Sequence, residues 1–144
     1  MKVLVDINIL LDVILRREPY YADSRRVIDC CISFVDGYIS LHSFATLFYV
    51  LHEREHKDVE YCRIVITNFL YLFDVAGLNR TELLRAINNP AFLDLEDSMQ
   101  HESAVSNEIN YIITRDRNDF AGAKVPSLSP KEFLDIAQAD RLCL

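Results

Sequence analysis

The sequence is poor in residues that interrupt regular structure, since it holds only 3 glycines and 4 prolines among 144 residues. This scarcity excludes collagen-like and low-complexity chains, and the large share of apolar residues excludes a disordered one. No apolar run approaches the roughly 20 residues that are needed to cross a bilayer. At about 100 to 200 residues per domain, residues 1–144 fit one globular domain with a hydrophobic core.

Positive charge is also scarce, because 15 Lys and Arg stand against 22 Asp and Glu and give a formal charge of −7. The overall charge therefore disfavours nonspecific binding to nucleic acid, and a polyanionic partner would need a local basic patch or metal ions. In the opening MKVLVDINIL, Asp6 stands where a signal peptide would continue its apolar stretch. We therefore expect a cytoplasmic protein with no membrane association.

The four cysteines form no C-x-x-C pair, which argues against a zinc ribbon and a disulfide framework. We expect Cys30, Cys31, Cys62 and Cys143 to be reduced and mostly buried. The sequence also lacks a P-loop, a G-x-G-x-x-G loop, a G-x-S-x-G elbow and an H-E-x-x-H motif. Nucleotide-cofactor enzymes and serine hydrolases therefore have little support.

Short β-branched runs alternate with segments of helical spacing. Strands are predicted at residues 2–5, 38–41, 73–75, 111–114 and 124–127. Helices are predicted from about residue 9, over 20–35, from 43, over about 59–70, over 82–87, from 94 and from 130. We expect Gly37 to end the second helix, Thr81 to cap the helix over 82–87, and Ser129 to cap the last helix. This alternation predicts an α/β fold with a mostly parallel sheet.

Two acids stand directly after predicted strands. Asp6 follows the first strand, and Asp116 follows the fourth in YIITRDRNDF, with Asp119 three residues further on. Carboxyl ends of parallel strands form the ligand-binding edge of such sheets, so Asp6 and Asp116 converge if their strands are neighbours. Asp6 has the alternative role of a helix cap. Asn8 is either a turn former or a side chain that orients Asp6.

A third acidic cluster, D-L-E-D, opens the helix before the fourth strand. Asp94 is best explained as its cap, and the helix dipole alone would favour Glu96 and Asp97 there. Convergence with the other acids favours Asp97 as a site residue. His101, four residues later, would share its helix face and permits a supporting role, although we expect an exposed neutral histidine.

Carboxylates without matching Cys or His ligands are typical of Mg²⁺ or Mn²⁺ sites and not of zinc. A water on such an ion has a lowered pKa and is a competent nucleophile toward a phosphodiester. The same ions would offset the repulsion between the acids and RNA.

Three segments of the chain, VLVDINILLDV, DLEDSMQHESAV and YIITRDRNDF, together resemble the PIN domain family, of the kind found in bacterial VapC-type toxins. The resemblance covers nearly the whole length of the chain. It implies a sandwich of helices around a parallel sheet of four to five strands, in three α/β/α layers. It also implies a metal-dependent ribonuclease whose acids bind Mg²⁺ or Mn²⁺.

The resemblance assigns roles residue by residue. Asp6, Asp97 and Asp116 match the principal acids, which act in catalysis and metal binding. Asp119 matches a weaker acidic metal position, and Glu96 is an adjacent candidate. Thr114 and Asn8 match positions that support the site through hydrogen bonds.

One position departs from the family pattern. Thr46 stands where many PIN domains have a glutamate, and it could hold a metal-bound water instead. Glu53 lies seven residues later on the same face, but two turns are about 10 Å, too far for a substitute. For substrate contact, we favour Arg115 and Arg117, which flank Asp116. Further candidates for substrate contact are Arg16, Arg17, Arg54 and Lys57, although solvated surface charge is the favoured interpretation for each.

These observations favour a Mg²⁺-dependent endoribonuclease, the toxin of a type II toxin–antitoxin system, with an antitoxin segment that fills the cleft. DNA remains an alternative substrate. Large side chains in the predicted helical hairpin fit a homodimer or antitoxin surface, with core packing as the alternative: Phe44, Phe48, Tyr49, Tyr61 and Phe69.

The second interpretation is a noncatalytic PIN-like binding or assembly module, which Thr46 and the net charge favour. The sequence lacks the acidic pair that a receiver domain requires at its first strand. It also lacks the D-x-D motif that a haloacid-dehalogenase phosphatase requires after that strand.

Overall fold

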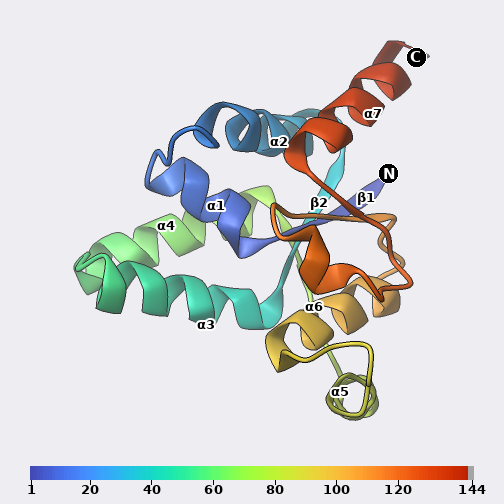
Figure 1. The fold of residues 1–144 in the computed structure, drawn as a ribbon. Helices are drawn as coiled ribbons and strands as arrows, with labels where there is room; N and C mark the ends of the chain where they lie inside the picture. Colours follow the sequence, from blue (N-terminus) through green and yellow to red (C-terminus); the bar gives the residue numbers. More distant parts are fainter. Residues whose placement is uncertain (143–144) are drawn as a thin grey trace.

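The computed structural model describes residues 1–142, and Figure 1 shows its ribbon. Five parallel strands form one sheet in the order β3-β2-β1-β4-β5. Their bounds are β1 Lys2–Val5, β2 Asp36–Ser40, β3 Asp74–Ala76, β4 Tyr111–Ile113 and β5 Ser127–Leu128. β1 lies in the middle and pairs with both β2 and β4, so the strand order reverses there. The switch point of the sheet is therefore the carboxyl end of β1 and β4.

Helices connect these strands and cover both faces of the sheet. The α-helices are α1 Ile7–Ile14, α2 Tyr21–Ser33, α3 Leu41–Tyr49, α4 Val59–Leu72, α5 Arg80–Ile87, α6 Leu95–Ser106 and α7 Pro130–Leu142. A π-helical turn, η1 Val50–Arg54, continues α3, and a short 3₁₀ helix, η2 Arg117–Phe120, follows β4.

Alternate residues of β1 point into two separate hydrophobic clusters. Val3 and Val5 enter the larger cluster, which contains side chains from α1, α2, α3, α4 and α7. Leu4 enters the smaller cluster with Ala104 of α6 and Phe120 of η2. Because successive strand residues face opposite sides, this apolar run needs helices on both faces. The expected three-layer α/β/α fold is confirmed.

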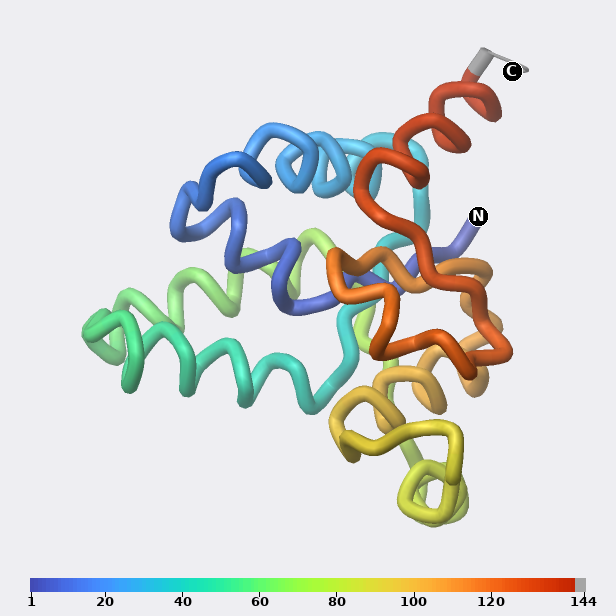
Figure 2. Tube along the Cα trace, in the orientation of Figure 1, coloured from blue at the N-terminus to red at the C-terminus, as the bar shows by residue number. Residues whose placement is uncertain are grey.

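The carboxyl edge of the sheet gathers the starts of several elements. Figure 2 shows the beginnings of α1, α3 and α6 and the loop after β4 around one region of the trace. Each helix begins directly after a strand or a short loop, so a side chain at its start faces this region. The expectation that the first and fourth strands are neighbours is confirmed, since Leu4 pairs with Ile112.

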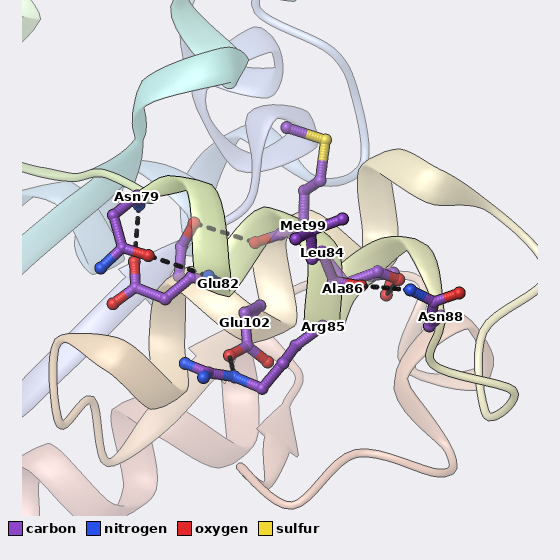
Figure 3. A network of polar contacts seen from close by, with 10 residues as sticks. Asn79, Glu82, Leu84, Arg85, Ala86, Asn88, Met99 and Glu102 are labelled. Atoms are coloured by element: carbon purple, nitrogen blue, oxygen red, sulfur yellow. Dashed lines mark hydrogen bonds and ion pairs between the residues drawn. The ribbon is translucent and has the colours of Figure 1, made fainter.

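Behind this edge, α5 fixes α6 in place. Asn79 and Glu82 form a capping box at the start of α5, as Figure 3 shows. The Ser98 hydroxyl donates to the Ala86 carbonyl over 2.6 Å, and Arg85 donates to the buried Glu102 over 2.7 Å. These contacts fix the orientation from which the first turn of α6 presents its acids.

Two predictions about helix ends are wrong. α2 ends at Ser33, and Gly37 lies inside β2, where a Cβ would come within 2.7 Å of the Phe73 ring. Close packing, and not helix termination, therefore requires that glycine. Asn79, and not Thr81, caps α5, because Asn79 stands three residues before Glu82, the spacing of a capping box, whereas Thr81 lies inside the helix.

The last strand is shifted to 127–128, where Thr114 N donates to the Leu128 carbonyl. The Ser129 cap is confirmed, since its hydroxyl accepts from Glu132 N over 3.2 Å. Cys30, Cys31 and Cys62 are free thiols, of which Cys30 is only partly buried, and Cys143 lies outside the described residues. Within residues 1–142, no helix is both long and apolar enough to span a membrane.

Candidate active site

Asp6 occupies the N-cap position of α1, but its side chain does not cap the helix. Its Oδ2 accepts from the Thr114 hydroxyl over 2.8 Å, and its Oδ1 accepts from Gln100 Nε2 over 3.4 Å. The alternative of Asp6 as a helix cap is therefore wrong. Only 7% of Asp6 is exposed, and this burial raises the pKa of its carboxyl, partly offset by the two hydrogen bonds.

Asp116 lies beside Asp6 across the switch point. Thr114 connects them, because its hydroxyl donates to Asp6 and accepts from the Asp116 backbone N–H over 2.9 Å. Asn8 donates to Asp116 Oδ2 over 2.6 Å. It therefore orients Asp116, whereas the sequence suggested that it orients Asp6. Asp116 is exposed, which leaves the other side of its carboxylate open.

Asp97 reaches the same place from the first turn of α6. Asp94 caps this helix as expected, because its Oδ1 accepts from Asp97 N over 3.0 Å. Partial burial and then the neighbouring carboxylates raise the pKa of Asp97 to about 7; the carboxylates belong to Asp94, Asp119, Asp6 and Glu96. Four carboxylates contribute to this shift, so Asp97 stands where negative charge is concentrated.

Thr46 and Glu96 meet from opposite elements. The Thr46 hydroxyl on α3 donates to Glu96 Oε1 on α6 over 3.1 Å. Thr46 is the position where many relatives were expected to have a glutamate, so α6 brings a carboxylate toward that position from the other side. Glu53 lies in η1, is exposed, and does not line the cavity described next.

A cavity of about 240 Å³ contains these side chains, and we call it the acid cavity. It is lined by Asp6, Ile7, Asn8, His42, Ser43, Thr46, Asp94, Glu96, Asp97, Gln100, Asp116 and Asp119. None of these lining residues is Lys or Arg. Burial lowers the pKa of His42, which keeps this neighbouring imidazole neutral near pH 7.

The donor set of the acid cavity fits a hard divalent cation. Carboxylate, amide and hydroxyl oxygens are the ligands that Mg²⁺ and Mn²⁺ prefer, and the raised pKa of Asp97 shows that its negative neighbours are not offset. Within residues 1–142, however, no three His, Cys, Asp or Glu side chains already stand at the spacing of a metal site. The acids share one cavity, and their side chains would need to rotate toward one another to hold an ion together.

The two arginines expected to hold substrate phosphates are both engaged in ion pairs. Arg115 donates to Asp12 from Nε and Nη2, over 2.8 and 3.0 Å, and its guanidinium stacks 3.9 Å from the centre of the Tyr20 ring. Arg117 donates to Glu132 over 2.8 Å. These contacts favour a structural role for Arg115 over the substrate contact we predicted.

Sequence reasoning missed Asp12. Its side chain is fully buried in α1 and also accepts from the Ser24 hydroxyl over 2.9 Å. The only available signal was a charged residue between Leu11 and Val13, on an otherwise apolar helix. Asp12 therefore ties α2 and the loop that begins at Arg115 to α1.

The expectation of an exposed His101 is wrong. Only 3% of His101 is exposed, its Nε2 accepts from Lys124 N over 3.0 Å, and its ring packs 5.0 Å from that of Phe92. Burial lowers the pKa of His101, in agreement with a neutral ring that accepts a hydrogen bond. His101 does not line the acid cavity, and its hydrogen bond fixes the segment after η2 on α6.

Comparison with solved structures gives the same fold. A toxin–antitoxin complex from Klebsiella pneumoniae matches with a TM-score of 0.67 at 21% identity, over 89% of this chain and 97% of that one. VapBC2 from Rickettsia felis, bound to a promoter DNA fragment, matches with 0.66 at 14% identity, over 90% and 98%. VapC20 from Mycobacterium tuberculosis, a toxin that cleaves the sarcin–ricin loop, matches with 0.61 at 10% identity, over 76% and 86%.

A comparison with curated protein sequences finds no match. The sequence itself matches the family described as PIN domain over residues 2–118. This stretch contains β1 to β4 and every acid of the acid cavity except Asp119, which lies one residue beyond it. The chain belongs to the PIN domain family.

Proposed function

We propose that the protein is a metal-dependent endoribonuclease that hydrolyses RNA phosphodiester bonds in the cytoplasm. The observation that carries this proposal is the convergence of Asp6, Asp97 and Asp116 in one cavity at the switch point of a PIN fold. The comparison with VapC20, described as a toxin that cleaves an RNA loop, supports this substrate class. Such an enzyme is a hydrolase with Mg²⁺ or Mn²⁺ as cofactor.

The proposed mechanism divides the work among the residues of the acid cavity. Bound Mg²⁺ or Mn²⁺ would supply a water of lowered pKa and neutralise charge on the scissile phosphate. Asp6, Asp97 and Asp116 would hold the metal, with Asp119 and Glu96 within reach. Thr114 fixes Asp6 and the Asp116 backbone together, and Asn8 directs the Asp116 carboxylate.

Glu96 is the residue best placed to supply the acid that α3 lacks. The hydroxyl of Thr46 already donates to its carboxylate over 3.1 Å, which restricts the Glu96 rotamer toward the acid cavity. In this proposal Thr46 positions Glu96, and Glu96 takes the ligand role that many relatives give to a glutamate on the helix of Thr46.

Toxin–antitoxin complexes among the solved neighbours support an antitoxin partner for this protein. A homodimer is also part of this proposal. The α4 helix offers a surface for such contacts, because Ile64, Leu70 and Tyr71 are 54%, 48% and 84% exposed. Of the large side chains singled out in the hairpin, Tyr49 and Tyr61 are exposed, whereas Phe69 is buried in the core and Phe44 and Phe48 pack against it. Light scattering of the purified protein would measure the oligomeric state.

A noncatalytic binding or assembly module is the second candidate. The observation that favours it is the spacing of the acids, since no three of them within residues 1–142 already stand as a metal site. This interpretation predicts a stable partner complex and no hydrolysis.

The test is cleavage of structured RNA, single-stranded RNA and single-stranded DNA with Mg²⁺, Mn²⁺ or EDTA. The matched control is the Asp6→Asn, Asp97→Asn variant, with folding checked by circular dichroism. We expect metal-dependent cutting of RNA that is lost in the variant. Identical behaviour of the two folded proteins on every substrate would overturn the nuclease and favour the binding module, and cutting of DNA alone would reassign the substrate.

A further inference from the structure

A second cavity adjoins the acid cavity. It has a volume of about 770 Å³ and is lined mainly by α1 and by the continuous α3–η1 helix, which contacts α1. The two cavities are neighbours, because both are lined by Ile7, Asn8, Thr46 and Glu96. We call this second cavity the arginine groove, because Arg17 and Arg54 line it beyond the shared residues.

Arg17 reaches the groove from the end of α1. Arg16 takes a left-handed backbone conformation with φ of 49°, and Arg17 N donates back to the Asp12 carbonyl over 2.9 Å. This is the hydrogen bond of a Schellman helix end, and it turns the chain so that Arg17 stays beside the last turn of α1. Among the side chains described, no acid lies within ion-pair distance of Arg17.

Arg54 reaches the groove from the other wall. Glu55 N donates to the Val50 carbonyl over 3.0 Å, a bond between residues five apart that defines the π-helical turn. Residues five apart therefore lie on nearly one face, and the Arg54 guanidinium stands 5.7 Å from the centre of the Tyr49 ring. Within the described chain, Arg54 has no carboxylate partner either.

Tyr49 adds an aromatic surface to the same wall. Its side chain is 52% exposed and lines the groove. An exposed aromatic ring with an arginine over it is a platform on which an unpaired base can stack. Duplex RNA offers no free base face in its interior, so this platform selects single strands.

The contrast with other arginines makes this pair specific. Arg115 and Arg117 are held by Asp12 and Glu132, whereas within residues 1–142 neither Arg17 nor Arg54 forms an ion pair, and both line the groove next to the acid cavity. A protein of net charge −7 needs local cations wherever phosphates approach it. In the groove Arg17 and Arg54 stand against two acids, Glu55 and the shared Glu96, so the groove offers positive charge that the acid cavity lacks.

We propose that the arginine groove binds the single-stranded RNA that flanks the bond in the acid cavity. Arg17 and Arg54 contact its phosphates, and Tyr49 stacks on a base. This proposal rests on the proposed nuclease function and specifies its substrate. A protein segment is the rival occupant of the groove.

The first test measures binding without cleavage. In an Asp6→Asn background with Mg²⁺, fluorescence anisotropy would follow a short labelled single-stranded RNA of mixed sequence at several salt concentrations. Arg17→Ala with Arg54→Ala should reduce the salt slope by about 1.4, because each phosphate contact on a single strand contributes about 0.7. Tyr49→Ala should weaken binding at least about fivefold, and Tyr49→Phe should keep it.

The matched control is Arg26→Ala. Arg26 is exposed on α2 and lines a separate pocket between α2 and α7, away from the acids. Its removal should leave the salt slope and the affinity at the level of the background protein. Unchanged binding after loss of both groove arginines would overturn the proposal and assign the groove to a protein segment. Equal competition by duplex RNA would overturn its single-strand part.

Kinetics in the wild-type background separate this proposal from the nuclease proposal. The groove variants should raise KM for single-stranded RNA about tenfold with kcat nearly unchanged, whereas acid variants should lower kcat. If the wild type cleaves RNA and the groove variants keep its KM, the groove assignment is wrong and the nuclease stands. If the wild type neither binds nor cleaves RNA, both proposals fail.

Discussion

Two buried aspartates of the same helix region meet opposite environments. Asp12 is fully buried and is matched by a bidentate arginine and a serine hydroxyl. Asp6 is almost as buried, yet its hydrogen bonds come only from neutral groups, Thr114 and Gln100. This difference indicates that Asp12 stabilises the fold, whereas the carboxylate of Asp6 remains available to a ligand.

The largest expected effect tests the ligand side of this comparison. Asp6→Asn should reduce RNA cleavage by about 10³-fold, because a bound ion supplies several kcal/mol of transition-state stabilisation. Asn preserves the size of the side chain and can still accept a hydrogen bond from Thr114. Single-turnover cleavage in excess Mg²⁺ measures the loss. Retained cleavage by a folded Asp6→Asn protein would contradict the assignment.

The second prediction tests the structural side. Asp12→Asn should lower the free energy of unfolding by about 3 kcal/mol, since it leaves the Arg115 guanidinium without its charge partner. Asp6→Asn should lower the free energy of unfolding by less, because Asp6 has no cationic partner that the substitution would leave buried and unpaired. Urea denaturation of both variants measures the contrast. If both variants lose the same free energy of unfolding, the structural role assigned to Asp12 alone is contradicted.

The third prediction concerns the pair that crosses from α3 to α6. Glu96→Gln should weaken Mn²⁺ binding by about 10- to 100-fold, and Thr46→Val should weaken it by less, since Thr46 acts only through the Glu96 carboxylate. Electron paramagnetic resonance of Mn²⁺ measures affinity independently of activity. Thr46→Ser keeps the hydroxyl and is the matched control. If Glu96→Gln binds Mn²⁺ as the wild type does, Glu96 is not a ligand.

The smallest expected effect is on pH dependence. The pKa of Asp97 is raised from 3.8 to about 7, so the folded protein holds a proton there that the unfolded chain has lost between these values. The stability from this group is therefore present at low pH and is lost as pH rises through about 7. In EDTA, wild type should lose stability relative to Asp97→Asn between pH 5 and pH 8, which thermal unfolding measures. A constant difference between the two proteins would contradict the raised pKa.

Much of the fold and the acidic positions was predictable because strand ends leave local signals. Asp6 and Asp116 each follow a β-branched run, and parallel pairing of those runs brings them together. The partner of Asn8 was not predictable, since the side chain reaches past Asp6 to a loop 108 residues away in sequence.

The arginines that flank Asp116 show what neighbours in sequence cannot predict. Arg115 lies next to Asp116 in sequence, but the packing of α1 directs its guanidinium to Asp12. Arg17 and Arg54 looked like ordinary surface charge, because only the packing of α1 against α3 creates the groove between them. The contact of Thr46 with Glu96, 50 residues apart, has the same tertiary origin.

The wide spacing of the acids along the chain has a consequence for synthesis. Asp6 is translated more than a hundred residues before Asp116 and Asp119. A nascent chain therefore carries no complete acid cavity until β4 and the loop after it have left the ribosome. For the proposed nuclease, this order means that the messenger and the ribosomal RNA meet a complete acid cavity only after these last acids have been translated.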